Sequence, residues 1–283
     1  MSIFNRAEII DSNFTKFVKK GNLPQARTIL DLSQTNIKPT ELISIFESQV
    51  LSRHMDLKAR LLKDEGKCFY TIGSSGHEGN AVFGNIFSYN DMAFLHYRSG
   101  PFFIERSKKL PGTTPIYDMA LSFMASSEDP ISGGRHKVIG SKKLNIPPQT
   151  STIASHLPKA VGTAFSIDRA KDLNIKERQL EDESIVLCSF GDASLNHASA
   201  LSAFNTANWI TNLGGHVPII FICEDNGLGI SVPTNEDWVE KNYNNRPNTR
   251  YIQTDGLQMI DLILKSKEAE KICRQSRSPV FLH

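Results

Sequence analysis

Two apolar stretches of the chain are each followed by a side chain that can hold a cation. The run "SIVLCSF" (184–190) is followed by Asp192 after one glycine, and the run "PIIFICE" (218–224) is followed by Asn226 after one aspartate. If both runs are neighbouring strands of a parallel sheet, their carboxyl ends share one edge, where ligands of such sheets bind. A carboxylate, an amide oxygen and a backbone carbonyl suit Mg²⁺, which fills its octahedron with phosphate oxygens and water. The sequence therefore predicts a magnesium site that compensates the charge of Asp192.

An anion would complete such a site. The backbone amides of Ala193 and Ser194, at the start of the following helix, are placed to donate to a phosphate oxygen. Each motif also has a plainer interpretation, since Gly-Asp after a strand is a common turn and Asp caps helices well. Together, one helix apart at the ends of successive apolar strands, the two motifs favour the metal–phosphate hypothesis.

The elements that position these residues alternate between apolar strands and helices. Strands are predicted at 184–190, 216–226, 250–256 and 278–283, and helices at 151–173, 196–210 and 257–275, after a long Gly/Pro/Lys-rich loop at 127–150. This order predicts the α/β class, with a parallel sheet flanked by helices on both faces. No Gly-x-Gly-x-x-Gly follows any strand, which disfavours a nicotinamide-binding domain.

The first part of the chain is predicted to be helical. Short helices are expected within 5–35, and a long amphipathic helix within 38–67, with Pro39 as a start signal and Gly66 as a stop. Its apolar positions are Leu42, Ile43, Ile45, Phe46, Val50, Leu51 and Leu57. We predict a helical N-terminal extension at 1–38 and one α/β domain at 39–283, which ends on a core-like strand and so suggests a longer natural polypeptide.

The composition is that of an ordinary soluble protein. The 283 residues are 40% hydrophobic and 22% charged, with a net charge of +2 and dispersed basic residues, so nucleic-acid binding is not expected. No apolar run approaches a membrane span, and the N-terminus is a poor signal peptide, so we expect a cytoplasmic protein without membrane contact. The cysteines Cys68, Cys188, Cys223 and Cys273 lack metal spacing and are expected to be reduced core thiols.

Beyond these patterns, the chain resembles a known family. The stretch "GDASLNHASALSAFNTANWITNLGGHVPIIFICEDNGLGISVPT" resembles the thiamine diphosphate signature, which is Gly-Asp-Gly, a spacer and Asn-Asn. Upstream, "SSGHEGNAVFGNIF", "HYRSG" and "STIASHLPKAVGTAFS" resemble family segments in the same order. From about residue 40 onward the chain is similar to the alpha subunit of the decarboxylating component of thiamine diphosphate-dependent 2-oxo acid dehydrogenases, either branched-chain (2-oxoisovalerate) or pyruvate enzymes.

The resemblance implies a role for each matching residue. Thiamine diphosphate and Mg²⁺ would be the cofactors, and the metal would be held by Asp192, Asn226 and the backbone carbonyl of Leu228. The remaining implied contacts are Tyr97 and Arg98 with the diphosphate, Gly191, Ala193 and Ser194 lining the diphosphate, and Ser151, Ile153 and Ile230 near the thiazolium and aminopyrimidine rings. His136 in the long loop would assist catalysis, with a solvent-exposed histidine as the alternative.

The match also departs from the family pattern. Ala193 stands where the signature has its second glycine, and Asp225 stands where it has the first asparagine. Alanine keeps the backbone amide, so phosphate contact survives if position 193 does not need a positive φ.

The family also implies partners and a substrate. The cofactor lies between two chains, and the glutamate that activates it comes from a beta subunit or a fused beta-like domain, so we expect a heterotetramer. A small 2-oxo acid, with a branched-chain acid favoured, would be decarboxylated and its acyl group passed to a lipoyl-bearing acyltransferase component. Pyruvate or acetoin dehydrogenase, a transketolase-like enzyme and a non-catalytic cofactor-holding module are the alternatives.

Overall fold

The computed structural model describes residues 6–22, 30–69, 71–135, 137–230 and 232–283. The α-helices are α1 (Arg6–Lys20), α2 (Pro39–Asp64), α3 (Ala81–Ile86), α4 (Gly100–Ser107), α5 (Pro115–Phe123), α6 (His156–Asp172), α7 (Ala198–Asn212), α8 (Trp238–Tyr243) and α9 (Met259–Ser276). The strands are β1 (Met92–Phe94), β2 (Val186–Gly191), β3 (Ile219–Glu224), β4 (Leu228–Gly229), β5 (Val232–Pro233), β6 (Arg250–Ile252) and β7 (Val280–Leu282). Short 3₁₀ helices are η1 (Leu32–Gln34), η2 (Glu78–Asn80), η3 (Lys142–Leu144) and η4 (Asp192–Asn196).

A parallel sheet organises the described part of the chain. Its strands follow the order β1-β2-β3-β7-β6, and every neighbouring pair is parallel. The last strand of the chain, β7, lies between β3 and β6 in the interior of the sheet. The predicted α/β class with a parallel sheet is confirmed.

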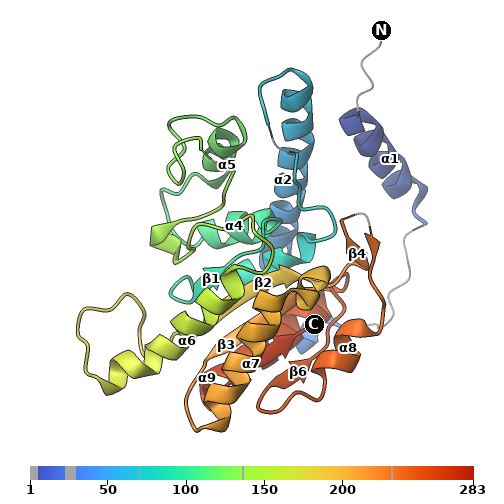
Figure 1. Ribbon diagram of the computed structural model, residues 1–283. Coiled ribbons are helices and arrows are strands. Elements are labelled where there is room, and N and C mark those ends of the chain that lie inside the picture. Colours follow the sequence, from blue (N-terminus) through green and yellow to red (C-terminus); the bar gives the residue numbers. More distant parts are fainter. Residues whose placement is uncertain (1–5, 23–29, 70, 136, 231) are drawn as a thin grey trace.

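Both faces of the sheet are apolar, because alternate side chains of each strand enter two different cores. Leu187 of β2 and Ile220 of β3 point into one core, which they share with residues of α3, α4 and α9. Val186 and Phe221 point into the other, which contains residues of α6, α7 and α8. Figure 1 shows α6 and α7 side by side on their face of the sheet. This double burial explains why the strands read as continuous apolar runs.

The long helix α2 is confirmed, with Pro39 in its first turn, but the prediction of its buried face is partly wrong. Ile43 and Phe46 are 68% and 55% exposed, whereas Ser52 and Asp56 are buried. The buried polar side chains are satisfied by hydrogen bonds: Ser52 and Asp56 both bond to Ser74. These hydrogen bonds offset the desolvation of the buried polar side chains. The apolar periodicity of the sequence does not reveal such partners.

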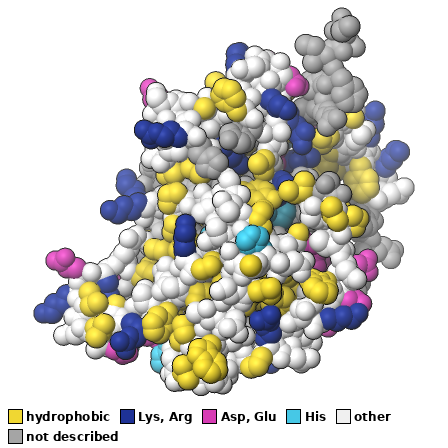
Figure 2. Space-filling model, in the orientation of Figure 1, with side chains coloured by type: hydrophobic (Ala, Val, Ile, Leu, Met, Phe, Trp, Pro, Cys, Tyr) yellow, Lys and Arg dark blue, Asp and Glu magenta, His cyan; other side chains and the backbone are white. Residues whose placement is uncertain are grey.

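Further expectations concern the N-terminal helix, the cysteines, membrane-spanning helices and the surface charges. Helix α1 lies outside the sheet-and-helix body and contacts α2 (Figure 1), while the boundary at 38/39 stays a prediction. All four cysteines are buried and none forms a disulfide, as expected. Among the described residues, no helix combines the length and apolar character needed to cross a bilayer. Figure 2 shows basic side chains dispersed over one face among hydrophobic and polar ones.

Candidate functional site

The candidate site lies at the carboxyl ends of β1, β2 and β3. The prediction that β2 and β3 are neighbours is confirmed, and their register pairs Gly191 with Glu224. Asp192 therefore comes opposite Asp225, one position before Asn226. Strand β1 pairs with β2 on the other side and leads into the segment that carries Arg98. Three strand ends thus present polar side chains to one edge of the sheet.

Asp192 is a buried carboxylate at this edge. It is 4% exposed and accepts a hydrogen bond from the hydroxyl of Thr234. Burial raises the pKa of Asp192, and the neighbouring Asp225 carboxylate raises it further. Among the described residues, no Lys, Arg or His forms an ion pair with Asp192. A divalent cation would relieve both the desolvation and the repulsion, so this environment fits a metal ligand.

Asp225, which departs from the family signature, has its own partner. The Nε2 atom of His283 lies 3.0 Å from its Oδ2, and Tyr251 Oη lies 2.7 Å from the Nδ1 of His283. The hydrogen bond from His283 lowers the pKa of Asp225. A hydrogen bond from the residue after β7 therefore stabilises the extra carboxylate. Nothing in the sequence pattern pointed to His283 or to Thr234, because both reach the site only through the fold.

Asn226 occupies a tight turn between β3 and β4. Its Oδ1 accepts the N–H of Leu228 at 3.1 Å, and its Nδ2 lies 3.3 Å from Nε2 of His77. An amide oxygen has two lone pairs, so Oδ1 can serve the turn and a cation together. The contact with His77 fixes which end of the amide faces the edge.

Arg98 is held by a chain of contacts that starts in α2. Its Nη1 donates to the carbonyl of Gly73 at 2.7 Å, and its guanidinium lies 5.1 Å from the ring centroid of Tyr97. The next residue, Ser74, donates its N–H and its hydroxyl to Asp56 at 2.7 and 2.9 Å. The buried polar side chains of α2 therefore position the loop that holds Arg98, the residue predicted to bind the diphosphate.

A buried lysine, missed by the sequence reasoning, adds a second cation. Lys137 is 7% exposed, and its Nζ lies 3.4 Å from the carbonyl of Ile72 and 5.2 Å from the ring centroid of Phe123. Burial lowers the pKa of Lys137 to about 8, opposed by attraction to Asp56 and reinforced by repulsion from Arg98. Its position after a Gly-Gly-Arg-His loop gives no periodic signal of burial.

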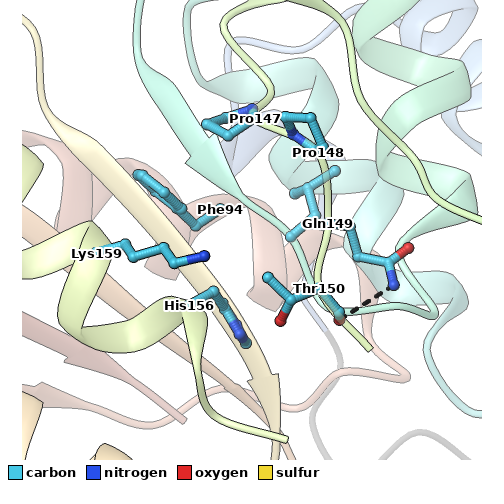
Figure 3. A pocket seen from close by; sticks show the side chains of 8 residues that line it. Phe94, Pro147, Pro148, Gln149, Thr150, His156 and Lys159 are labelled. Carbon is cyan, nitrogen blue, oxygen red and sulfur yellow. Dashed lines mark hydrogen bonds between the residues drawn. The ribbon is translucent and has the colours of Figure 1, made fainter. Parts of the chain in front are cut away.

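A pocket opens beside the end of β1. Its volume is about 280 Å³, and it is lined by Phe94, Leu95, Pro147, Pro148, Gln149, Thr150, His156 and Lys159. Figure 3 shows Lys159 and His156 of α6 on one side and Thr150 on the other, with Phe94 as part of the wall. His156 Nε2 lies 2.9 Å from the carbonyl oxygen of Ser189 in β2, and burial lowers the pKa of this imidazole. The pocket thus combines apolar walls with an exposed ammonium.

Comparison with known proteins assigns the family. The family model described as "Dehydrogenase E1 component" matches residues 47–283. The chain belongs to this family. Curated relatives of this E1 chain include the 2-oxoisovalerate dehydrogenase subunit alpha of Bacillus subtilis, 24% identical over 247 residues, which cover 86% of the chain and 69% of the relative. The mitochondrial alpha subunit of the same name from Homo sapiens is 26% identical over 220 residues, 76% of the chain and 44% of the relative.

Solved structures with the same fold belong to longer proteins. A transketolase from Pichia stipitis superposes with a TM-score of 0.57 at 15% identity, covering 87% of this E1 chain and 36% of that chain. A transketolase from Campylobacter jejuni gives 0.53 at 13% identity, covering 88% and 37%. The E1 chain also spans only 55% to 56% of its mouse and nematode relatives. These likenesses show the fold.

The remaining residues implied by the E1 family differ in placement. Ala193 and Ser194 lie in the 3₁₀ turn η4 rather than in α7, which begins at Ala198, so the expected helix start is wrong there. Ala193 has no positive φ, so the alanine keeps its amide without strain. A Cβ on Gly229 would come within 2.9 Å of the Ala193 Cβ, so β4 packs closely over this turn.

The residues predicted to contact the cofactor rings are exposed, and their roles stay predictions. Ser151 and Ile153 lie in the turns before α6, and Ile230 follows β4. Ile230 has φ +64°, a left-handed conformation that a β-branched residue adopts only under constraint. His136, the predicted catalytic residue, lies outside the described residues.

Proposed function

We propose that this chain is the alpha part of the decarboxylating component of a 2-oxo acid dehydrogenase complex. The observation that carries the proposal is Asp192, a buried carboxylate without an ion-pair partner among the described residues, opposite the turn that holds Asn226. Membership of the dehydrogenase E1 family supports it. The whole enzyme would catalyse oxidative decarboxylation of a 2-oxo acid and transfer the acyl group to lipoyl groups.

The cofactors in this proposal are thiamine diphosphate and Mg²⁺. Asp192, Asn226 and the carbonyl of Leu228 form a set of hard oxygen ligands, which suits Mg²⁺. When bound, thiamine diphosphate supplies the electron sink on which loss of carbon dioxide from a 2-oxo acid depends. The backbone amides of Ala193 and Ser194, next to Gly191, would donate to the diphosphate.

Cationic side chains of the chain would neutralise and orient the anion. Arg98 is held by the Gly73 carbonyl and by Tyr97, so its fork is ordered before the diphosphate arrives. Lys137 adds electrostatic attraction for the diphosphate. Burial lowers the pKa of Lys137 to about 8. Ile230, which follows β4, would contact the rings of the cofactor together with Ser151 and Ile153, which precede α6. His136 keeps the proposed role of moving a proton during the reaction.

The proposed partners follow from the same family. A beta subunit, or a fused beta-like part, would complete the site in a heterotetramer, and a lipoyl-bearing acyltransferase would accept the acyl group. The relatives that carry the name "subunit alpha" support a multi-subunit assembly. We favour 2-oxoisovalerate, a branched-chain acid, because these relatives are named for it, although the identities are only 24% to 26%. Pyruvate and acetoin remain the alternative substrates.

The test is a calorimetric titration of thiamine diphosphate in the presence of Mg²⁺, with the partner chain present. We expect one site per alpha chain and loss of that site in Asp192→Ala. The control is Asp237→Ala, because Asp237 is an exposed acid that forms a surface ion pair with Lys241 on α8. Release of carbon dioxide is then compared for 2-oxoisovalerate and pyruvate, and we expect a higher kcat/KM for the branched acid.

Two results would contradict parts of the proposal. Equal affinity in Asp192→Ala and wild type would show that the metal is not held at this edge. Binding of thiamine diphosphate without decarboxylation of any 2-oxo acid would favour the non-catalytic cofactor-holding module, for which Ala193 and Asp225 are the motivating departures.

A further inference from the structure

A cluster of two histidines and a glutamate lies beside the strand edge, outside the ligands assigned above. His77 belongs to the loop before η2, His96 follows β1, and Glu224 ends β3. One ligand atom from each of the three lies within 4.8 Å of the other two. His77 and His96 are 6% and 5% exposed, and the side chain of Glu224 is 9% exposed. Three segments distant in sequence therefore bring metal-binding groups into one buried volume.

Part of the hydrogen-bonding capacity of this cluster is used. Nδ1 of His77 lies 2.7 Å from Oε2 of Glu224, and Asn80 Nδ2 donates to the same oxygen at 3.3 Å. Nε2 of His77 lies 3.3 Å from Nδ2 of Asn226. Because the amide nitrogen can only donate, Nε2 of His77 accepts from Asn226 and Nδ1 donates to Glu224. An ion bound between His77 and Glu224 would therefore take the place of the Nδ1 proton, which is released to solvent.

The rest of the capacity is not used. Oε1 of Glu224 and Nδ1 of His96 are buried and have no hydrogen-bond partner among the described residues. A buried carboxylate oxygen or imidazole nitrogen without a partner costs free energy, and it points to a group that the protein itself does not supply. Both atoms belong to the same three-residue cluster, so one ligand can satisfy both.

The donor chemistry identifies the class of that ligand. Two imidazoles and one carboxylate are the set that binds Zn²⁺ and related transition-metal dications, whereas Mg²⁺ prefers oxygen ligands alone.

We propose that His77, His96 and Glu224 form a binding site for a transition-metal dication, with Zn²⁺ as the first candidate. The ion ties the loop before η2 to the ends of β1 and β3, and three protein ligands leave a fourth position for water. Asn226 contacts His77 through its nitrogen and not through its oxygen, so this site and the proposed magnesium site share no ligand. The inference does not depend on the proposed function.

The experiment uses the 283-residue chain stripped of metal with a chelator and kept free of thiamine diphosphate. We titrate it with Zn²⁺ by calorimetry and with Co²⁺ by visible absorption. We expect one equivalent of Zn²⁺ and intense Co²⁺ ligand-field bands, both lost in His96→Gln and in Glu224→Gln. The matched control is His54→Gln, an exposed histidine of α2, which should keep the full equivalent.

Controls separate this site from the strand-edge ligands and from misfolding. Asp192→Ala should still bind one equivalent, and circular dichroism should show the same fold in all variants. X-ray absorption of the zinc-loaded wild type should show two imidazoles, which requires no variant. The proposal is overturned if wild type binds no equivalent, if its ion has no imidazole ligands, or if Asp192→Ala loses the ion while His96→Gln keeps it.

Discussion

Replacing Lys137 with methionine should stabilise the protein near neutral pH. The side chain is 7% exposed, and burial lowers the pKa of Lys137 from its ordinary 10.5 to about 8. Since one pKa unit corresponds to about 1.4 kcal/mol, holding this charge in the folded state costs about 3 kcal/mol. Lys137→Met removes that cost but also the hydrogen bond to the Ile72 carbonyl, worth about 1 kcal/mol. We expect a gain of about 2 kcal/mol in the free energy of unfolding at pH 7.

The pH dependence has a definite sign. Between pH 8 and 10.5 the unfolded chain keeps the proton on Lys137 and the folded chain releases it, so the contribution of this group to stability rises with pH. Below pH 8 both states are protonated and the full cost remains. In Lys137→Met this rise is absent, so the stability advantage of the variant should shrink as the pH goes from 7 to 10.

The measurement is urea unfolding at several pH values between 7 and 10, for wild type and variant. The difference between the two curves cancels the titration of all other groups. Lys143→Met is the control, because Lys143 is exposed, and its stability should stay within about 0.5 kcal/mol of wild type at every pH. A variant that is less stable than wild type at pH 7, with a difference independent of pH, would refute the reasoning.

Two further substitutions test a contact beneath the site and an ion pair at the amino end of β1. Gly73→Ala would place a Cβ 2.6 Å from the Asp56 carboxyl group, so the loop must shift and the calorimetric affinity for thiamine diphosphate should fall by about tenfold; Gly162→Ala, with open space around it, should leave the affinity unchanged. Asp91→Asn breaks a pair in which Nη1 and Nη2 of the partly exposed Arg274 contact the buried carboxylate at 3.1 and 2.5 Å. Arg274 keeps its contact with Glu270, so we expect a loss of about 1.5 to 3 kcal/mol in urea unfolding, and an unchanged stability would contradict this.

Local chemistry in the sequence was enough for much of the fold. The apolar runs that end at Gly191 and Glu224 identified β2 and β3, and Pro39 marked the start of α2. The same reading placed the strand ends at one edge, because parallel strands flanked by helices have few topologies. It missed the buried polar face of α2, since Ser52 and Asp56 are recognisable as buried only once their partner Ser74 is in place.

The sequence by itself determined the class of fold, the succession of strands and helices along the chain from residue 184 onward, and the two motifs at 192 and 226, because periodicity and turn chemistry act over a few neighbouring residues. Only the tertiary structure decided which side chains meet: His77 with Glu224, 147 positions apart, His283 with Asp225, and Lys137 with the loop at Ile72. Desolvation and pairing set the ionisation of these groups, and both depend on atoms brought together by folding.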